Sequence, residues 1–228
     1  MPEPGQKATG KARIAVGILC GRGETDEALR VIQHCLSDPN VHTVLPLFPA
    51  APTKCRGKFV FYPPAAQNRR GAARTELLRV LYRLQDTDIR VLLDDDTLPL
   101  DDYFELLAHL PIIDKPCLFT GRLQNADGHR CWDVCSFENG NPVVVPYDFI
   151  DHPKWSGDLY FSGPQHIFNR AGATLGAKIG YPDLTYGEDT QFCRNFREQG
   201  GELVFVTDIQ AKLLHQHNPP NQPSLSWA

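Results

Sequence analysis

A short apolar run that ends in three consecutive carboxylates constrains the fold of this chain more than any other feature. The run is Arg90–Leu93, and Asp94, Asp95 and Asp96 follow it directly. A strand that is buried on both faces reads as such a run, and open α/β sheets bind their ligands at the carboxyl ends of their strands. We therefore expect a buried strand whose carboxyl end carries the three aspartates.

The same three carboxylates indicate chemistry. Along an extended chain Asp94 and Asp96 point to the same face, about 6–7 Å apart. Like charges at that distance repel each other unless a cation or hydrogen-bond donors satisfy them. Carboxylate oxygens suit Mg²⁺ or Mn²⁺, ions that usually also take phosphate oxygens from a substrate. The run is thus interpreted as a metal and diphosphate site. The alternative is a solvated acidic turn ahead of a helix that follows Pro99.

Strands are expected to alternate with helices up to Asp96. The apolar periodicity and the turn residues predict earlier strands over Arg13–Cys20, His42–Phe48 and Lys58–Tyr62. They also predict a helix from about Thr25 to Asp38 and another with Ala73, Leu77, Leu81 and Leu84 on one face. Such alternation is typical of a parallel, Rossmann-like α/β sheet with right-handed crossovers.

The second half of the chain is less regular. We expect helices over Leu100–Leu110, near Asn169–Ala177 and through Phe192 and Phe196, and strands over Cys117–Leu123, Leu203–Val206 and Ile209–Leu214. Turn-forming and aromatic residues over 124–165 predict hairpins and loops. Residues 1–12 are expected to be a disordered lead-in and 218–228 a loose tail, which leaves 13–217 as a single domain.

The overall composition excludes several classes of protein. Of 228 residues, 42% are hydrophobic and 22% charged, and the formal net charge of −4 gives no strong nucleic-acid signal. No stretch approaches the roughly 20 apolar residues of a transmembrane segment, and the first residues lack the apolar core of a signal peptide. We therefore expect a cytoplasmic protein.

Cysteine usage favours reduced thiols over a disulfide framework. The chain has seven cysteines, an odd number, scattered through predicted core and loop positions. His129, Cys131 and Cys135 lie close together in the sequence, but no second ligand pair at standard spacing accompanies them. A zinc site is therefore not expected.

The segment Gly187-Glu188-Asp189 forms a second candidate site, at the predicted start of an amphipathic helix. Acids in a first turn are favourable for the helix macrodipole, which is the alternative reading. A carboxylate at this position can also accept a proton from a sugar hydroxyl, the general-base role that attack at an anomeric carbon requires. Asp189 and Glu188 are therefore candidate catalytic residues.

His215 and His217 form a third candidate group. On a strand both imidazoles point to the same face, and neutral imidazole is a good ligand for Mn²⁺-class metals. One of them could complete a metal site begun by Asp96. The alternative is a pair of satisfied or exposed histidines at a strand end.

Together the three groups resemble the GT-A glycosyltransferases, in particular the inverting enzymes of the glycosyltransferase family 2 type. The resemblance lies in the order of a strand ending in Asp-Asp-Asp, a Gly-Glu-Asp helix start and a late histidine. The segment from Gln67 to Arg74 is also similar to that family's Asn-x-Gly-x-x-x-Ala-Arg segment, although Arg69 or Arg70 replaces the first glycine. The resemblance covers about residues 13–217.

The resemblance implies a GT-A fold, an α/β fold with a central mostly parallel sheet flanked by helices. It divides the domain into a nucleotide-binding half, 13–96, and an acceptor-binding half, 97–217. The implied activity is metal-dependent transfer of a sugar from a nucleotide-diphospho-sugar donor to a hydroxyl of a carbohydrate or glycoconjugate. The cofactor would be Mn²⁺ or Mg²⁺, and the donor a UDP-, GDP- or dTDP-sugar. Inversion is favoured because no second carboxylate is clearly placed as a nucleophile.

The resemblance also implies a role for each candidate residue. The residues that would bind the nucleotide are Gly21, Arg22, Arg74, Asp94 and Asp95, with Asp94 or Asp95 taking the ribose. Asp96 would bind the metal, with His215 ahead of His217 as its partner. Asp189 would be the general base, and Glu188 would hold the acceptor or orient the base. Residues 155–158 and 161–163 would shape the donor-sugar and acceptor pocket.

Two other functions fit part of the pattern. A sugar-nucleotide pyrophosphorylase shares the α/β fold and the metal. Such an enzyme would need a basic residue and a threonine in a glycine-rich loop directly after the first strand. In this chain Glu24 lies in that loop, and its negative charge would repel a triphosphate. The other is a catalytically inactive sugar- or nucleotide-binding module of the same fold, which would have no reason to keep all three groups.

Overall fold

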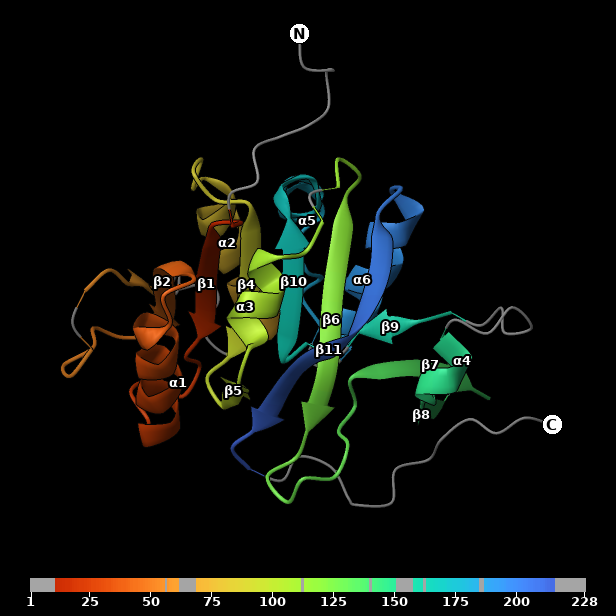
Figure 1. Ribbon diagram of the computed structural model, residues 1–228, viewed down its shortest axis with the longest axis horizontal. Helices are drawn as coiled ribbons and strands as arrows, with labels where there is room; N and C mark the ends of the chain where they lie inside the picture. The colour runs from red at the N-terminus through yellow and green to blue at the C-terminus, as the bar shows by residue number, and fades with distance from the viewer. Residues whose placement is uncertain are drawn as a thin grey trace, which may run out of the picture.

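The computed structural model describes residues 11–55, 57–61, 69–111, 113–139, 141–150, 158–161, 163–184 and 187–215. The expected lead-in as far as residue 10, the expected tail and His217 lie outside these described residues, as do 62–68, 155–157 and Ser162. Figure 1 shows the described chain as a curled central sheet with helices packed against it.

The central sheet is mostly parallel. Within the described ranges it has eight strands in the order β3-β2-β1-β4-β10-β6-β11-β5. Their bounds are β1 Ile14–Leu19, β2 Val41–Phe48, β3 Val60–Phe61, β4 Ile89–Asp94, β5 Thr97–Pro99, β6 Cys117–Gln124, β10 Gln165–Asn169 and β11 Glu202–Leu213. The first four strands in that order are parallel, and so are β6 and β11, whereas β10 and the edge strand β5 run antiparallel to their neighbours. The expected mostly parallel α/β sheet is confirmed.

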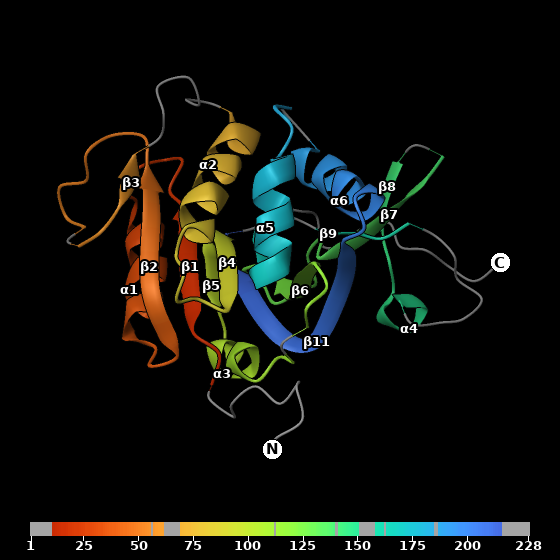
Figure 2. The same ribbon diagram turned by 90° about the horizontal axis from the view of Figure 1, so that it is seen from above.

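Helices cover both faces of the sheet, as Figure 2 shows from above. α1 (Asp26–Ser37) and α3 (Tyr103–Ala108) lie on one face, and α2 (Arg70–Tyr82), α5 (Arg170–Ile179) and α6 (Glu188–Glu198) lie on the other. Residues of β1 alternate between the two cores, with Ile14, Val16 and Ile18 on the α1 side. A Cβ on Gly17 would come within 2.8 Å of Leu77 in α2. This glycine therefore permits the close packing of α2 on β1.

The start of α1 follows from its sequence. Thr25 is the N-cap, and its hydroxyl accepts a hydrogen bond from the backbone N–H of Ala28 at 3.1 Å. Asp26 and Glu27 occupy the first turn, where negative charge is favourable for the helix macrodipole. The predicted helix start near Thr25 is confirmed.

A smaller sheet lies beside the central one. It consists of β7 (Val134–Glu138), β8 (Asn141–Val144) and β9 (Tyr160–Phe161), in the order β8-β7-β9, and the short helix α4 (Tyr147–Ile150) follows β8. Its strands pair antiparallel. The hairpins and loops expected over 124–165 are therefore confirmed.

The path of the chain after β4 differs from the expectation. β4 ends at Asp94, and Asp95 and Asp96 form a turn, so Asp94 and Asp96 do not follow one another along an extended strand. The solvated acidic turn is also wrong, because Asp95 and Asp96 are each only 6% exposed. The turn leads into β5, which the sequence did not predict and which pairs with the distant strand β11.

Two element boundaries are corrected by the same pairing. The helix expected from Leu100 begins at Tyr103, because the N–H of Leu100 donates to the carbonyl of Gln210 in β11 at 3.0 Å. The two strands expected over 203–214 are one continuous strand, β11, with a register shift between Val206 and Gln210. Both corrections arise from contacts between residues far apart in the sequence.

Candidate active site

The acidic turn after β4 is held beside the end of β11. Thr97 of β5 pairs with Leu213 of β11, and the N–H of Leu214 donates to the carbonyl of Asp96 at 2.8 Å. This pairing places His215 next to the turn, with its Nε2 atom 3.1 Å from Oδ2 of Asp96. Asp96 and His215, which we expect to bind a metal together, are therefore in contact.

Arg22 joins this group from the turn after β1. Its guanidinium lies 3.3 Å from Oδ1 of Asp95, 3.6 Å from Oδ2 of Asp96 and 3.2 Å from Nε2 of His215. Burial raises the pKa of Asp95, and the positive charge of Arg22 only partly offsets this effect. We call Arg22, Asp95, Asp96 and His215 the acidic corner.

Arg74 connects the carboxyl end of β4 to the start of α6. This side chain of α2 is 3% exposed, and it lies 2.8 Å from Oδ1 of Asp94 and 3.5 Å from Oε1 of Glu188. It also donates to the carbonyl of Gly163. Burial raises the pKa of Asp94 to about 6 even though Arg74 opposes the shift. Arg74 is thus a buried cation shared between the end of β4 and the start of α6.

Asp189 is fixed by two backbone donors. Its Oδ2 accepts from the N–H of Gly163 at 2.8 Å, and its Oδ1 accepts from the N–H of Thr190 at 2.7 Å. A Cβ on Gly163 would lie 2.9 Å from Nη2 of Arg74 and 3.2 Å from Oδ2 of Asp189. Gly163 is therefore held by Arg74 through its carbonyl and by Asp189 through its N–H, and a larger residue would crowd both side chains.

The loop before α6 is positioned by the first turns of α2. A Cβ on Gly71 would come within 2.0 Å of the carbonyl oxygen of Pro182, so only glycine allows this close approach. The hydroxyl of Thr75 accepts from the N–H of Tyr181 at 2.7 Å and donates to the carbonyl of Gly71. The segment around Gly71 therefore sets where α6 begins.

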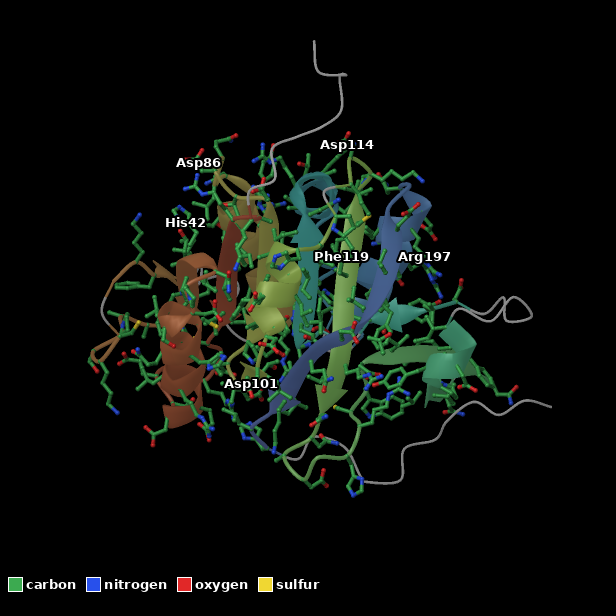
Figure 3. All side chains as sticks on the ribbon, in the orientation of Figure 1. His42, Asp86, Asp101, Asp114, Phe119 and Arg197 are labelled. Carbon is green, nitrogen blue, oxygen red and sulfur yellow. The ribbon has the colours of Figure 1, made fainter. Side chains whose placement is uncertain are left out.

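The structure brings most of the candidate residues to one edge of the sheet. Their contacts form two sets, which meet where Asp95 follows Asp94 in the chain. One set is the acidic corner. The other joins Asp94, Glu188 and Asp189 through Arg74 and Gly163. Gly21 lies in the same turn as Arg22, but as a glycine it has no side chain that could contact either set. Asp158 does not join either set, because it pairs with Arg197 of α6 at 3.0 Å. Figure 3 labels Arg197 on the right of the view.

The donor atoms of the acidic corner fit a divalent metal only in part. In the part of the chain that the structure describes, no three His, Cys, Asp or Glu side chains are grouped so as to hold a metal ion on their own. Asp96 and His215 nevertheless offer one carboxylate and one imidazole, a pair that suits Mn²⁺ when phosphate oxygens supply further ligands.

Two groups near the site, one buried and one partly exposed, were not predicted. His166 of β10 is fully buried, with Nδ1 2.6 Å from the hydroxyl of Tyr181, and Tyr181 stacks on Phe192 of α6 at 3.9 Å. Burial, together with the positive charge of Arg74, lowers the pKa of His166 to about 4, so the imidazole is neutral at pH 7. No sequence motif identifies His166, because its contacts with Tyr181 arise only when the chain folds.

Glu24 is the second unpredicted group. Its carboxylate accepts from three successive backbone N–H groups, of Thr53, Lys54 and Cys55, and from the hydroxyl of Thr53. Desolvation acts to raise the pKa of Glu24, but these hydrogen bonds outweigh it and lower the pKa to about 2. Glu24 thereby ties the turn that carries Arg22 to the loop between β2 and β3.

The hydrogen bonds of Glu24 predict that the stability of the protein depends on pH. Because the pKa of Glu24 falls from its ordinary value of 4.5 to about 2 on folding, its contribution is present above about pH 4.5 and is lost as the pH falls through about 2. We expect Glu24→Gln to lower the thermal midpoint at pH 7, and the difference from the wild type to shrink below pH 4.5. Glu198→Gln, at an exposed position, is the control. A difference that stayed constant with pH would contradict the role of the carboxylate.

The comparisons with known proteins concern the fold. No family model matches the chain, and no curated protein matches it in sequence. A solved structure of GalNAc-T7 with UDP, GalNAc and Mn²⁺ is similar, with a TM-score of 0.60 and 12% identity over 93% of this chain and 46% of that one. That neighbour has a GT-A fold. The present chain has the same fold.

A second solved structure is more weakly similar. CMP:2-keto-3-deoxy-manno-octonic acid synthetase in complex with CTP aligns with a TM-score of 0.49 and 10% identity, over 87% of this chain and 91% of that one. The chain spans about half the length of GalNAc-T7. At 12% identity the comparison with GalNAc-T7 establishes the fold alone. Within the described ranges, no helix has the length and apolar character that a membrane crossing requires.

Proposed function

We propose that this protein is a metal-dependent glycosyltransferase that moves a sugar from a nucleotide-diphospho-sugar to an acceptor hydroxyl. One observation carries the proposal: Gly163 joins Asp189 to Arg74, and Arg74 joins both to Asp94 at the end of β4, directly before Asp95 and Asp96. The candidate general base is thus linked to the strand end that leads into the candidate diphosphate site, at the carboxyl edge of the sheet. This edge is where α/β folds bind nucleotides.

The donor would bind through the acidic corner. Asp96 and His215 would hold Mn²⁺ or Mg²⁺, which when bound neutralises the negative charge of a diphosphate leaving group. Asp95 is the better candidate for a ribose hydroxyl, because its buried Oδ2 has no hydrogen-bond partner among the described atoms. Asp94, by contrast, is paired with Arg74. Arg74 and Glu188 are interpreted as positioning residues, since both are buried and face each other.

Asp189 would activate the acceptor. Oδ1 accepts from both the N–H and the hydroxyl of Thr190, and Oδ2 accepts from the N–H of Gly163. The side chain is therefore held in place, and Oδ2 retains a lone pair that can take a proton. Proton transfer from an acceptor hydroxyl to Asp189 would let that hydroxyl attack the anomeric carbon from the side opposite the diphosphate. The product would have inverted anomeric configuration. The acceptor would be a carbohydrate or glycoconjugate.

A donor panel tests this proposal. UDP-, GDP- and dTDP-sugars are added to the wild type in Mn²⁺ or in EDTA, and thermal shift reports binding. We expect one nucleotide class to raise the thermal midpoint in Mn²⁺ only. Asp96→Ala and His215→Ala should each abolish that shift, since each removes a proposed ligand of the metal. Asp101→Ala, at the exposed turn labelled in Figure 3, should retain it. Equal shifts in Mn²⁺ and EDTA would overturn the metal assignment.

A further inference from the structure

Arg22 contacts both atoms that the proposed metal site would use. Its guanidinium lies 3.2 Å from Nε2 of His215 and 3.6 Å from Oδ2 of Asp96, and these two atoms lie 3.1 Å from each other. In the neutral tautomer whose proton is on Nδ1, Nε2 accepts from the guanidinium, and this hydrogen bond takes the lone pair with which the imidazole would bind a metal. The guanidinium and a divalent cation therefore compete for the same two atoms.

Arg22 can leave this position more easily than its partners can. Its side chain is 49% exposed, whereas those of Asp95 and Asp96 are 9% and 8% exposed. It lies between Gly21 and Gly23 at the tip of the turn after β1, where Gly23 has φ +82° and its N–H closes the turn onto the carbonyl of Cys20. The arginine can therefore reorient in solvent while the buried carboxylates stay in place.

We propose that Arg22 is a resident cation of the acidic corner that a divalent metal displaces and that then contacts the diphosphate of the donor. The first step rests on the contacts of Arg22 and on the proposed metal site, and the second rests on the proposed nucleotide-sugar donor. A displaced guanidinium remains tethered to the turn after β1, and its planar donors pair well with phosphate oxygens. Arg22 would thereby make nucleotide binding depend on prior metal binding.

The first step is tested with Mn²⁺ alone. Free Mn²⁺ is titrated against the protein without nucleotide and measured by electron paramagnetic resonance. Arg22→Gln removes the competing charge, so it should bind Mn²⁺ roughly tenfold more tightly than the wild type. Arg22→Lys keeps a cation and should stay near the wild type. Arg30→Gln, at an exposed position of α1, removes the same charge elsewhere and should leave the affinity unchanged.

The second step is tested with UDP, GDP and dTDP in saturating Mn²⁺ by calorimetry. Arg22→Gln should weaken binding of the preferred diphosphate roughly tenfold, while Arg30→Gln retains it. The two effects of Arg22→Gln thus have opposite signs, which a purely structural role would not produce. Mn²⁺ affinity equal to or below that of the wild type, or no Mn²⁺ binding by any variant, would overturn the inference. Tighter Mn²⁺ binding with no diphosphate bound by any variant would support displacement and count against the proposed function.

Discussion

Asp189→Asn is expected to lower the turnover of sugar transfer by roughly 10²–10⁴-fold, with donor affinity nearly unchanged. The amide keeps the shape of the side chain, and its oxygen can still accept from the N–H of Gly163 or Thr190. It cannot take a proton from the acceptor. Transfer rate and donor affinity, the latter by calorimetry in Mn²⁺, are measured on the same preparation.

The control for this change is Asp183→Asn. Asp183 lies in the loop before α6 and forms an exposed ion pair with Arg69 at 2.6 Å, so its loss removes a nearby negative charge without touching the site. The control should keep its turnover within about twofold of the wild type, as expected for an exposed pair worth about 0–1 kcal/mol. If Asp189→Asn lost donor binding together with activity, or kept full activity, the base assignment would be wrong.

Arg74→Gln is expected to destabilise the protein by about 3–5 kcal/mol, because it leaves the buried carboxylates of Asp94 and Glu188 without their cation. Urea unfolding gives the free-energy change. Arg79→Gln is the matched control, since Arg79 lies on the same helix but is exposed.

A double variant separates charge pairing from simple packing at Arg74. If the loss comes from uncompensated charge, adding Glu188→Gln to Arg74→Gln should recover part of the stability. Additive losses from the two changes, or a loss no greater than that of Arg79→Gln, would show that Arg74 does not hold β4 and α6 together through charge.

Local sequence signals predicted the first half of the fold well. The cap at Thr25, the apolar run of β4 and the periodicity of α2 each lie within a few residues, so each is visible without knowledge of the rest of the chain. β5 could not be predicted in this way. Its three residues become a strand only because β11 pairs with them, more than a hundred positions later in the sequence.

The same distinction holds for the site. The acidic residues and His215 were predicted as candidates from motif order, and the contact between Asp96 and His215 is present. The partners of Arg22 and Arg74 could not be predicted, because each arginine lies far in the sequence from the carboxylates that it meets, and only the folded sheet brings them together. Their positions explain why buried acids can share this edge of the sheet.

Product analysis tests the central claim most directly. The wild type is incubated with the preferred nucleotide-sugar and a hydroxyl acceptor, in Mn²⁺ and in EDTA, and the released nucleotide is identified by chromatography and mass spectrometry. The account predicts nucleoside diphosphate in equal amount to the transferred sugar, in Mn²⁺ only. Absence of nucleoside diphosphate from every donor, together with pyrophosphate release from a nucleoside triphosphate and a sugar phosphate, would contradict it and identify a pyrophosphorylase.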